Sequence, residues 1–86
     1  MGESNISMHK IEKSLKDKNI LFSSIVALPD SSYLISISNN GQVRLSLAKD
    51  IEKQISYLQR ILIQLTIEGK PFKNIDFRFI EPVISF

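Results

Sequence analysis

The fold depends most on the stretch from Asp50 to Glu68, which reads DIEKQISYLQRILIQLTIE. Its apolar residues recur at alternating intervals of four and three, so they form one stripe along a helix. The stripe consists of Ile51, Ile55, Leu58, Leu62 and Leu65. Gly69 follows as a C-terminal stop. The pattern predicts a helix of about 19 residues that packs its stripe on a sheet.

Two further isoleucines of this stretch lie outside the stripe. Ile63 and Ile67 are four residues apart and project about 140° away from it. We expect them to be partly exposed or covered by an N-terminal helix. That short amphipathic helix is predicted over Met8–Leu15, with Ser7 as N-cap. Its apolar residues are Met8, Ile11 and Leu15.

Upstream of the long helix, the chain has the pattern of β-strands. A first strand fits Ile20–Leu28, which ends at the turn cluster Pro29-Asp30-Ser31-Ser32. A hairpin follows over Tyr33–Leu47, and two loops compete for it. A two-residue turn at Asn40-Gly41 would set Ile37 opposite Arg44.

The alternative loop gives a better apolar face. A three-residue loop, Asn39-Asn40-Gly41, sets apolar residues opposite one another. The predicted pairs are Ile37–Val43, Ile35–Leu45 and Tyr33–Leu47. We therefore predict this register, with Gly41 in the left-handed position that closes such a loop.

The C-terminal residues predict two more strands. Ile75, Phe77 and Phe79 alternate with Asp76 and Arg78, as in a half-buried strand. Glu81-Pro82 then turns the chain into a last strand, Val83–Phe86. The expected register pairs Phe79 with Ile84 and Phe77 with Phe86. The predicted fold is α+β, a mostly antiparallel sheet with both helices packed on it, and the expected element order is αββαββ.

Length and composition limit the possible functions. The chain has 86 residues, 43% of them hydrophobic, which fits a single domain over residues 1–86. A formal net charge of +2 cannot neutralise many phosphates, so we expect no nucleic-acid partner. The absence of cysteine excludes disulfides, thiolate metal sites and a cysteine nucleophile. No apolar run is long enough to span a membrane, and we expect the chain to be a soluble fragment of a larger protein.

Few residues could support catalysis or hold a ligand. His9 is the only histidine and has no carboxylate cluster near it in the sequence, so we interpret it as a surface residue. Three glycines cannot form a phosphate-binding loop. Asp76 and Arg78 are expected to form a surface ion pair or a link to a neighbouring strand rather than an active site. We therefore expect no enzyme activity, no catalytic residue, no cofactor and no metal.

The last strands carry a recognisable pattern. The sequence NIDFRF at Asn74–Phe79 follows a long amphipathic helix and a GQVRL strand at 41–45. This arrangement resembles the extracytoplasmic β domain of the FtsQ/DivIB bacterial cell-division family, where a V-x-L strand, a helix with L-x-x-L spacing and an I-D-L-R-Y or I-D-L-R-F strand occur in that order. The resemblance extends from Tyr33 to Phe86, with Phe77 in place of the usual leucine. The matching positions are Gly41, Val43, Leu45, Ile55, Leu58, Leu62, Ile75, Asp76, Arg78 and Phe79.

The resemblance implies a function and a location. Members are non-enzymatic scaffolds of the division machinery, anchored in the cytoplasmic membrane with this domain on its outer face at the division site. The strand after the signature is the docking edge for the small partners FtsB and FtsL, or DivIC. Carried over, the signature is Gly41, Ile75, Asp76 and Arg78. The partner-binding residues are Phe79, Val83, Ile84, Ser85 and Phe86, of which we expect Ile84 and Phe86 to face the core.

Strand chemistry suggests how such docking would work. A last strand with no successor presents unpaired N–H and C=O groups to which a partner can add a strand. Pro82 has no N–H, so pairing should begin after it. Two other classes of protein remain open: a freestanding POTRA-like adaptor or peptide-binding module, and a regulatory domain of an enzyme. A membrane anchor or a catalytic domain in the full-length gene would distinguish them.

Overall fold

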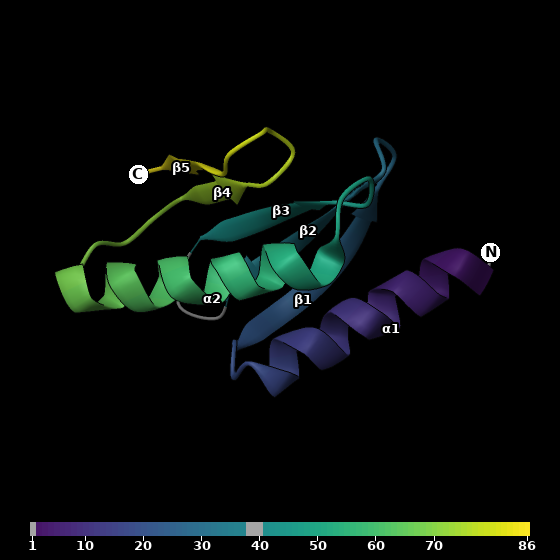
Figure 1. Ribbon diagram of the computed structural model, residues 1–86, viewed down its shortest axis with the longest axis horizontal. Helices are drawn as coiled ribbons and strands as arrows, with labels where there is room; N and C mark the ends of the chain where they lie inside the picture. Colours follow the sequence, from purple (N-terminus) through teal and green to yellow (C-terminus); the bar gives the residue numbers. More distant parts are fainter. Residues whose placement is uncertain (1, 38–40) are drawn as a thin grey trace.

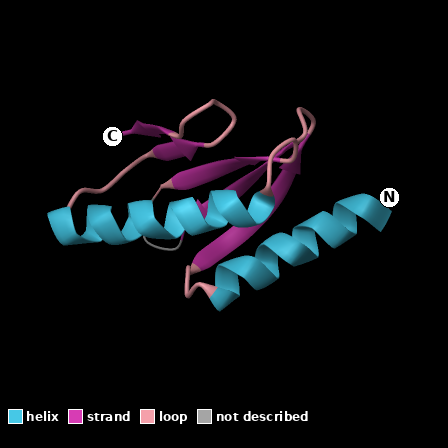
Figure 2. Cartoon of the chain, viewed as in Figure 1, coloured by secondary structure: helices cyan, strands magenta, loops and turns pink. Residues whose placement is uncertain are grey.

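The computed structural model describes residues 2–37 and 41–86 and has an α+β fold, as predicted (Figure 1). Its elements are α1 (Gly2–Asp17), β1 (Phe22–Leu28), β2 (Ser32–Ile37), β3 (Gln42–Ser46), α2 (Ile51–Glu68), β4 (Asn74–Asp76) and β5 (Val83–Ser85). The strands form one sheet in the order β1-β2-β3-β4-β5. Neighbouring strands are antiparallel except β3 and β4, which run parallel and are joined through α2. Figure 2 shows both helices beside this sheet.

Two details of the element order differ from the expectation. The first strand and the hairpin both form where they were predicted, which makes three strands before α2, so the order is αβββαββ rather than αββαββ. The first helix begins at Gly2 rather than at Met8. Its predicted apolar side remains correct, since Ile11 and Leu15 have no exposed surface.

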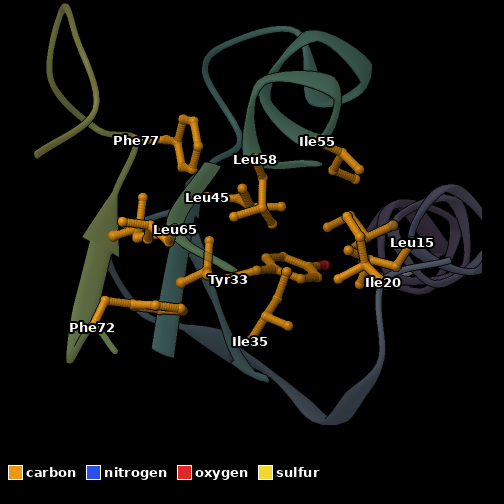
Figure 3. Packing of buried hydrophobic residues seen from close by; sticks show 13 residues of the cluster. Leu15, Ile20, Tyr33, Ile35, Leu45, Ile55, Leu58, Leu65, Phe72 and Phe77 are labelled. Atoms are coloured by element: carbon orange, nitrogen blue, oxygen red, sulfur yellow. The ribbon is translucent and has the colours of Figure 1, made fainter. Parts of the chain in front are cut away.

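The core lies between the two helices and the inner face of the sheet (Figure 3). Helix α2 contributes Ile55 and Leu58, and α1 contributes Ile11 and Leu15. Leu65 of α2 is buried as well. The remaining buried apolar residues come from the strands and connecting segments; they are Ile20, Tyr33, Ile35, Val43, Leu45, Phe72, Ile75 and Phe77. Both helices are therefore part of one hydrophobic core.

Helix α2 agrees closely with its prediction. The Asp50 side chain accepts from the Lys53 N–H at 3.1 Å and caps the helix. Gly69 ends it in the left-handed conformation with φ 67°. Ile63 and Ile67 are 54% and 74% exposed, so α1 does not cover them.

A buried amide fastens the start of α2 to the end of β3. The Gln54 side chain accepts from the Ser46 N–H at 2.8 Å and donates to the Ser46 carbonyl at 2.9 Å. These bonds satisfy both backbone groups of Ser46 at a buried position. The sequence gives no local sign of this contact.

The predicted hairpin register is wrong by two residues. The structure pairs Ile35 with Val43 and Tyr33 with Leu45. A slip of two residues leaves every side chain on its own face, so facing alone cannot choose between the two registers. Asn39 and Asn40 of the predicted loop lie outside the described residues. The φ angle of Gly41 depends on the position of Asn40, so the left-handed conformation of Gly41 stays a prediction.

The register predicted for the last two strands is also wrong. Strand β4 ends at Asp76, and the structure pairs Ile75 with Ile84 and Asp76 with Val83. Phe79 therefore lies in the connecting loop rather than in a strand. The prediction that β5 has a free far side is correct, because β5 is the last strand of the sheet. No helix in the described part of the chain is long and apolar enough to cross a membrane.

Candidate functional site at the open edge of the sheet

The backbone of β4 determines which groups of β5 face outward. Gln42 N–H donates to the Lys73 carbonyl at 2.8 Å, and Phe77 N–H donates to the Arg44 carbonyl at 2.9 Å. The Lys73 carbonyl, the backbone groups of Ile75 and the Phe77 N–H therefore face β3, and the backbone groups of Asn74 and Asp76 face β5.

The β5 residues opposite Asn74 and Asp76 consequently direct their backbone N–H and C=O groups toward β4. Ser85 lies opposite Asn74, and its carbonyl accepts from the Lys73 N–H at 2.7 Å. Val83 lies opposite Asp76. Since backbone direction alternates along a strand, the N–H and C=O of Ile84 point to the open edge. The side chain of Ile84, however, packs against the core.

The loop between β4 and β5, residues 77–82, is held in place by Lys49. Its ammonium group donates to the Phe77 carbonyl at 3.0 Å and also to the Phe79 carbonyl. Lys49 lies just before α2, so this contact fixes the loop to the helix layer. The loop that leads into β5 is thus fixed in position by contacts within the chain.

On the other side, the loop is held by an ion cluster made of Asp30, Arg44, Asp76 and Arg78. The guanidinium of Arg78 donates to both carboxylate oxygens of Asp76, with Nη2 at 2.7 Å from Oδ2. Its Nη1 lies 3.1 Å from Oδ2 of Asp30 in the β1–β2 turn. Arg44 Nη1 lies 3.6 Å from the same oxygen. The cluster therefore ties the β4–β5 loop to a turn far away in the sequence.

These contacts shift the pKa values of the charged groups. The Ser32 hydroxyl donates to Asp30 and, together with Arg44 and Arg78, lowers the pKa of Asp30 below its ordinary value of 3.8. Partial burial raises the pKa of Asp76, but the hydrogen bonds and charge of Arg78 outweigh this and lower it overall. Bonding to Asp76 raises the pKa of Arg78 despite some desolvation. Asp30, Asp76 and Arg78 are therefore charged at neutral pH.

Two hollows flank the loop. One, of about 220 Å³, is mostly apolar and lies against the start of α2; its lining includes Lys49, Tyr57, Phe77, Phe79 and Pro82. The other, of about 310 Å³, is polar; its lining includes Gln42, Arg44, Asn74, Asp76, Phe79 and Ser85. Phe79 lines both hollows. The polar hollow extends over one face of the sheet from β2 to β5, and the apolar hollow lies between the loop and the start of α2.

The predicted partner-binding residues do lie together at this edge, although not all as expected. Phe79 is 52% exposed and Val83 is 48% exposed, and Ser85 is exposed as well. The expectation that Phe86 faces the core is wrong, because it is 61% exposed, with Lys70 Nζ 5.7 Å from its ring centroid. Ile84 is half-buried. Ile80, at the tip of the loop, is fully exposed and was not predicted.

Each of the four signature residues packs against, or is ion-paired with, other parts of the domain. Ile75 is fully buried, and Asp76 and Arg78 form the ion pair that the sequence predicted. Gly41 lies against Phe72, where a Cβ would come within 2.1 Å of the ring. Sequence reasoning missed Lys49, Arg44 and the role of Asp30. Asp30 was noted only as part of a turn, and nothing local connects it to Arg78.

The other candidate residues form no second site. His9 is exposed on α1, as expected. Among residues 2–37 and 41–86, no group of histidine and carboxylate side chains could hold a metal ion. Comparison with family models, with curated proteins and with solved structures finds no match to this chain.

Proposed function

We propose that this domain is a non-enzymatic interaction module that binds an extended segment of a partner protein by strand addition at β5. The observation that carries the proposal is the direction of the β5 backbone. Ile84 presents its N–H and C=O to an open sheet edge, and an added strand would satisfy both groups. Because Lys49 and Arg78 hold the adjoining loop, little ordering of the domain would accompany binding.

The side chains around this edge suggest what the partner presents. Phe79, Val83 and Phe86 are large, apolar and about half exposed. Aromatic anchors of this kind often dominate binding at interfaces. We expect the added strand to carry apolar side chains that cover these three residues. The polar hollow beside Asn74 would favour a hydrogen-bonding side chain at the nearest position of the added partner strand.

The identity of the partner follows from the resemblance to the FtsQ/DivIB family. On that basis the domain belongs to a scaffold of the bacterial division machinery and binds FtsB/DivIC-like and FtsL-like proteins. The full-length protein is then anchored in the cytoplasmic membrane, with this domain on the extracytoplasmic face at the division site. What supports this assignment is the NIDFRF sequence at Asn74–Phe79 together with the open strand that follows it.

A matched pair of variants at Ile84 tests strand addition. Ile84→Pro and Ile84→Ala both lose the side chain that packs on the core, but only proline removes the outward N–H. Proline is tolerated on an edge strand when its N–H side faces solvent, so the ladder to β4 should survive. We expect the proline variant to bind the extracytoplasmic segment of an FtsB/DivIC-like protein at least tenfold more weakly than the alanine variant, which is about 1.4 kcal/mol.

Calorimetric titration measures both affinities, and circular dichroism verifies that both variants are folded. Ser85→Pro is a poor choice for this test, because Ser85 faces β4 and proline there would break the sheet itself. Equal affinities of the two Ile84 variants would contradict strand addition. Binding of unrelated extended peptides, with none of the division segment, would instead favour a general peptide-binding adaptor.

A further inference from the structure

The sheet has a second open edge, at β1, and it is unlike the first. β5 has three residues and follows Glu81-Pro82, whereas β1 has seven residues, FSSIVAL, without charge or proline. Short length, charge and proline are the usual means by which proteins prevent an edge from pairing. Helix α1 contacts β1 but supplies no strand to it (Figure 1). Ser23, Ser24, Val26 and Ala27 are exposed along this edge.

Hydrogen bonds across the sheet show which backbone groups of β1 have no partner among residues 2–37 and 41–86. Ile37 N–H donates to the Gly41 carbonyl at 3.0 Å, and Leu47 N–H donates to the Ser31 carbonyl at 3.1 Å. The odd-numbered residues of β2 therefore face β3, and its even-numbered residues face β1.

The register between β1 and β2 completes this assignment. Ser24, Val26 and Leu28 lie opposite the even-numbered residues of β2, so they face β2. The N–H and C=O groups of Ile25 and Ala27 then point to the open edge. The register shift between Phe22 and Ser24 restricts the regular part of this edge to residues 24–28.

We propose that β1 is a self-association edge, where the β1 strands of two copies of this chain pair antiparallel about Val26. In this register Val26 lies opposite Val26 of the second copy, and Ile25 lies opposite its Ala27. Each Ile25 and Ala27 would exchange backbone hydrogen bonds with the other copy, which satisfies the four unpaired groups of each chain. The two five-stranded sheets would join into one.

The side chains are compatible with this pairing. Ile25 and Ala27 lie on the helix side of the strand and meet each other, while Val26 meets its own copy on the outer face. Such a contact is isologous and closes as a dimer rather than a fibre. A second copy fits better than a charged peptide because the whole strand is neutral, and a net charge of +2 opposes association only weakly.

The test uses two matched pairs of variants at exposed positions. Ala27→Pro removes an outward N–H and leaves the β2 ladder intact, whereas Ala27→Ser keeps that N–H. Val26→Lys sets two like charges opposite each other at the centre of the pairing, whereas Val26→Thr stays neutral. Sedimentation equilibrium up to about 1 mM protein measures the mass of each folded variant.

We expect the wild-type chain and the serine and threonine variants to approach twice the monomer mass of 9.8 kDa. The proline and lysine variants should stay at 9.8 kDa. Amide exchange at Ile25 and Ala27 should slow with rising protein concentration, while Ser24 and Val26 should not respond. If the proline variant does not fold, the Val26 pair decides the question.

Two results would overturn the proposal. One is a wild-type mass that stays at 9.8 kDa over the whole concentration range. The other is a dimer that the Ala27 and Val26 variants leave unchanged and that Ile84→Pro abolishes, which would place the contact at β5. Because the Ile84 variants leave β1 unaltered, failure at one edge is distinguishable from failure at the other.

Discussion

Gly41 adjoins Phe72 so closely that no side chain fits between them. A Cβ at this position would lie 2.1 Å from Cε2 of the ring and 2.7 Å from the Phe72 carbonyl oxygen. Phe72 is buried, so the backbone must move to make room. We predict that Gly41→Val lowers the free energy of unfolding by about 1–3 kcal/mol or more, measured by urea denaturation.

Two comparisons separate crowding from backbone conformation. Gly69→Ala places a Cβ in open space at φ 67°, so it tests conformational strain alone, of about 1–2 kcal/mol. Phe72→Leu introduced with Gly41→Ala should recover part of the loss, because the two positions touch. A Gly41→Ala variant as stable as the wild type would show that this packing is not required.

The ion cluster predicts how stability depends on pH. Asp30 and Asp76 have pKa values below the ordinary 3.8, so the folded state binds fewer protons than the unfolded state. Their stabilising contribution is therefore complete above that ordinary value and is lost as the pH falls through the lowered folded values. We predict that Asp76→Asn makes the fall in unfolding free energy below about pH 4 shallower.

Urea denaturation at a series of acidic pH values measures this dependence. In the described part of the chain, the exposed carboxylate of Asp17 lies 3.9 Å from Lys13 Nζ, so Asp17→Asn serves as the control and should leave the slope nearly unchanged. Equal slopes for Asp76→Asn and the wild type would contradict a role of this pair in holding the loop.

At the scale of elements, α2 joins the two halves of the sheet through its stripe. Leu58 is fully buried in this stripe, and Leu62 is only half-buried. We predict that Leu58→Ala costs about 2–5 kcal/mol in unfolding free energy, and that Leu62→Ala costs less. Ile67→Ala, at an exposed position of the same helix, should change it by less than about 0.5 kcal/mol. Similar losses at Leu58 and Ile67 would contradict the assigned face of the helix.

The elements themselves could be predicted from the sequence, but the strand registers could not. The spacing of Ile51, Ile55 and Leu58 fixes both the type and the buried face of α2. In a strand the side-chain period is two, so a shift by two or four residues preserves the same faces. Both register errors are of this kind. At β4, Phe79 leaves the strand because Arg78 turns back to bind Asp76 and Asp30.

The candidate site was predictable only in part, because some of its contacts join residues that are far apart in the sequence. Val83, Ser85 and Phe79 could be located from the terminal strand pattern. The residues that hold the loop could not, because Lys49 and Asp30 reach it from 30 and 48 positions away in the chain. Long-range polar contacts leave no periodic trace in a sequence, so only the folded chain shows them.

At the scale of the whole molecule, the two proposed contacts lie at the two edges of the sheet. The edge at β5 is short and bordered by exposed apolar side chains. It therefore suits a partner strand whose own apolar side chains cover them. The edge at β1 is longer and neutral, as suits pairing with a copy of itself. Since the edges lie at opposite ends of the strand order, both contacts could form on one molecule.

The most direct test of strand addition is amide hydrogen exchange of the domain saturated with the extracytoplasmic segment of an FtsB/DivIC-like protein. We predict that the Ile84 amide, which faces the open edge, becomes at least about tenfold more protected, because it gains a hydrogen bond to the added strand. The Ser85 amide already faces β4 and should change far less. A saturated complex in which Ile84 exchanges as fast as in the free domain would contradict the proposed function.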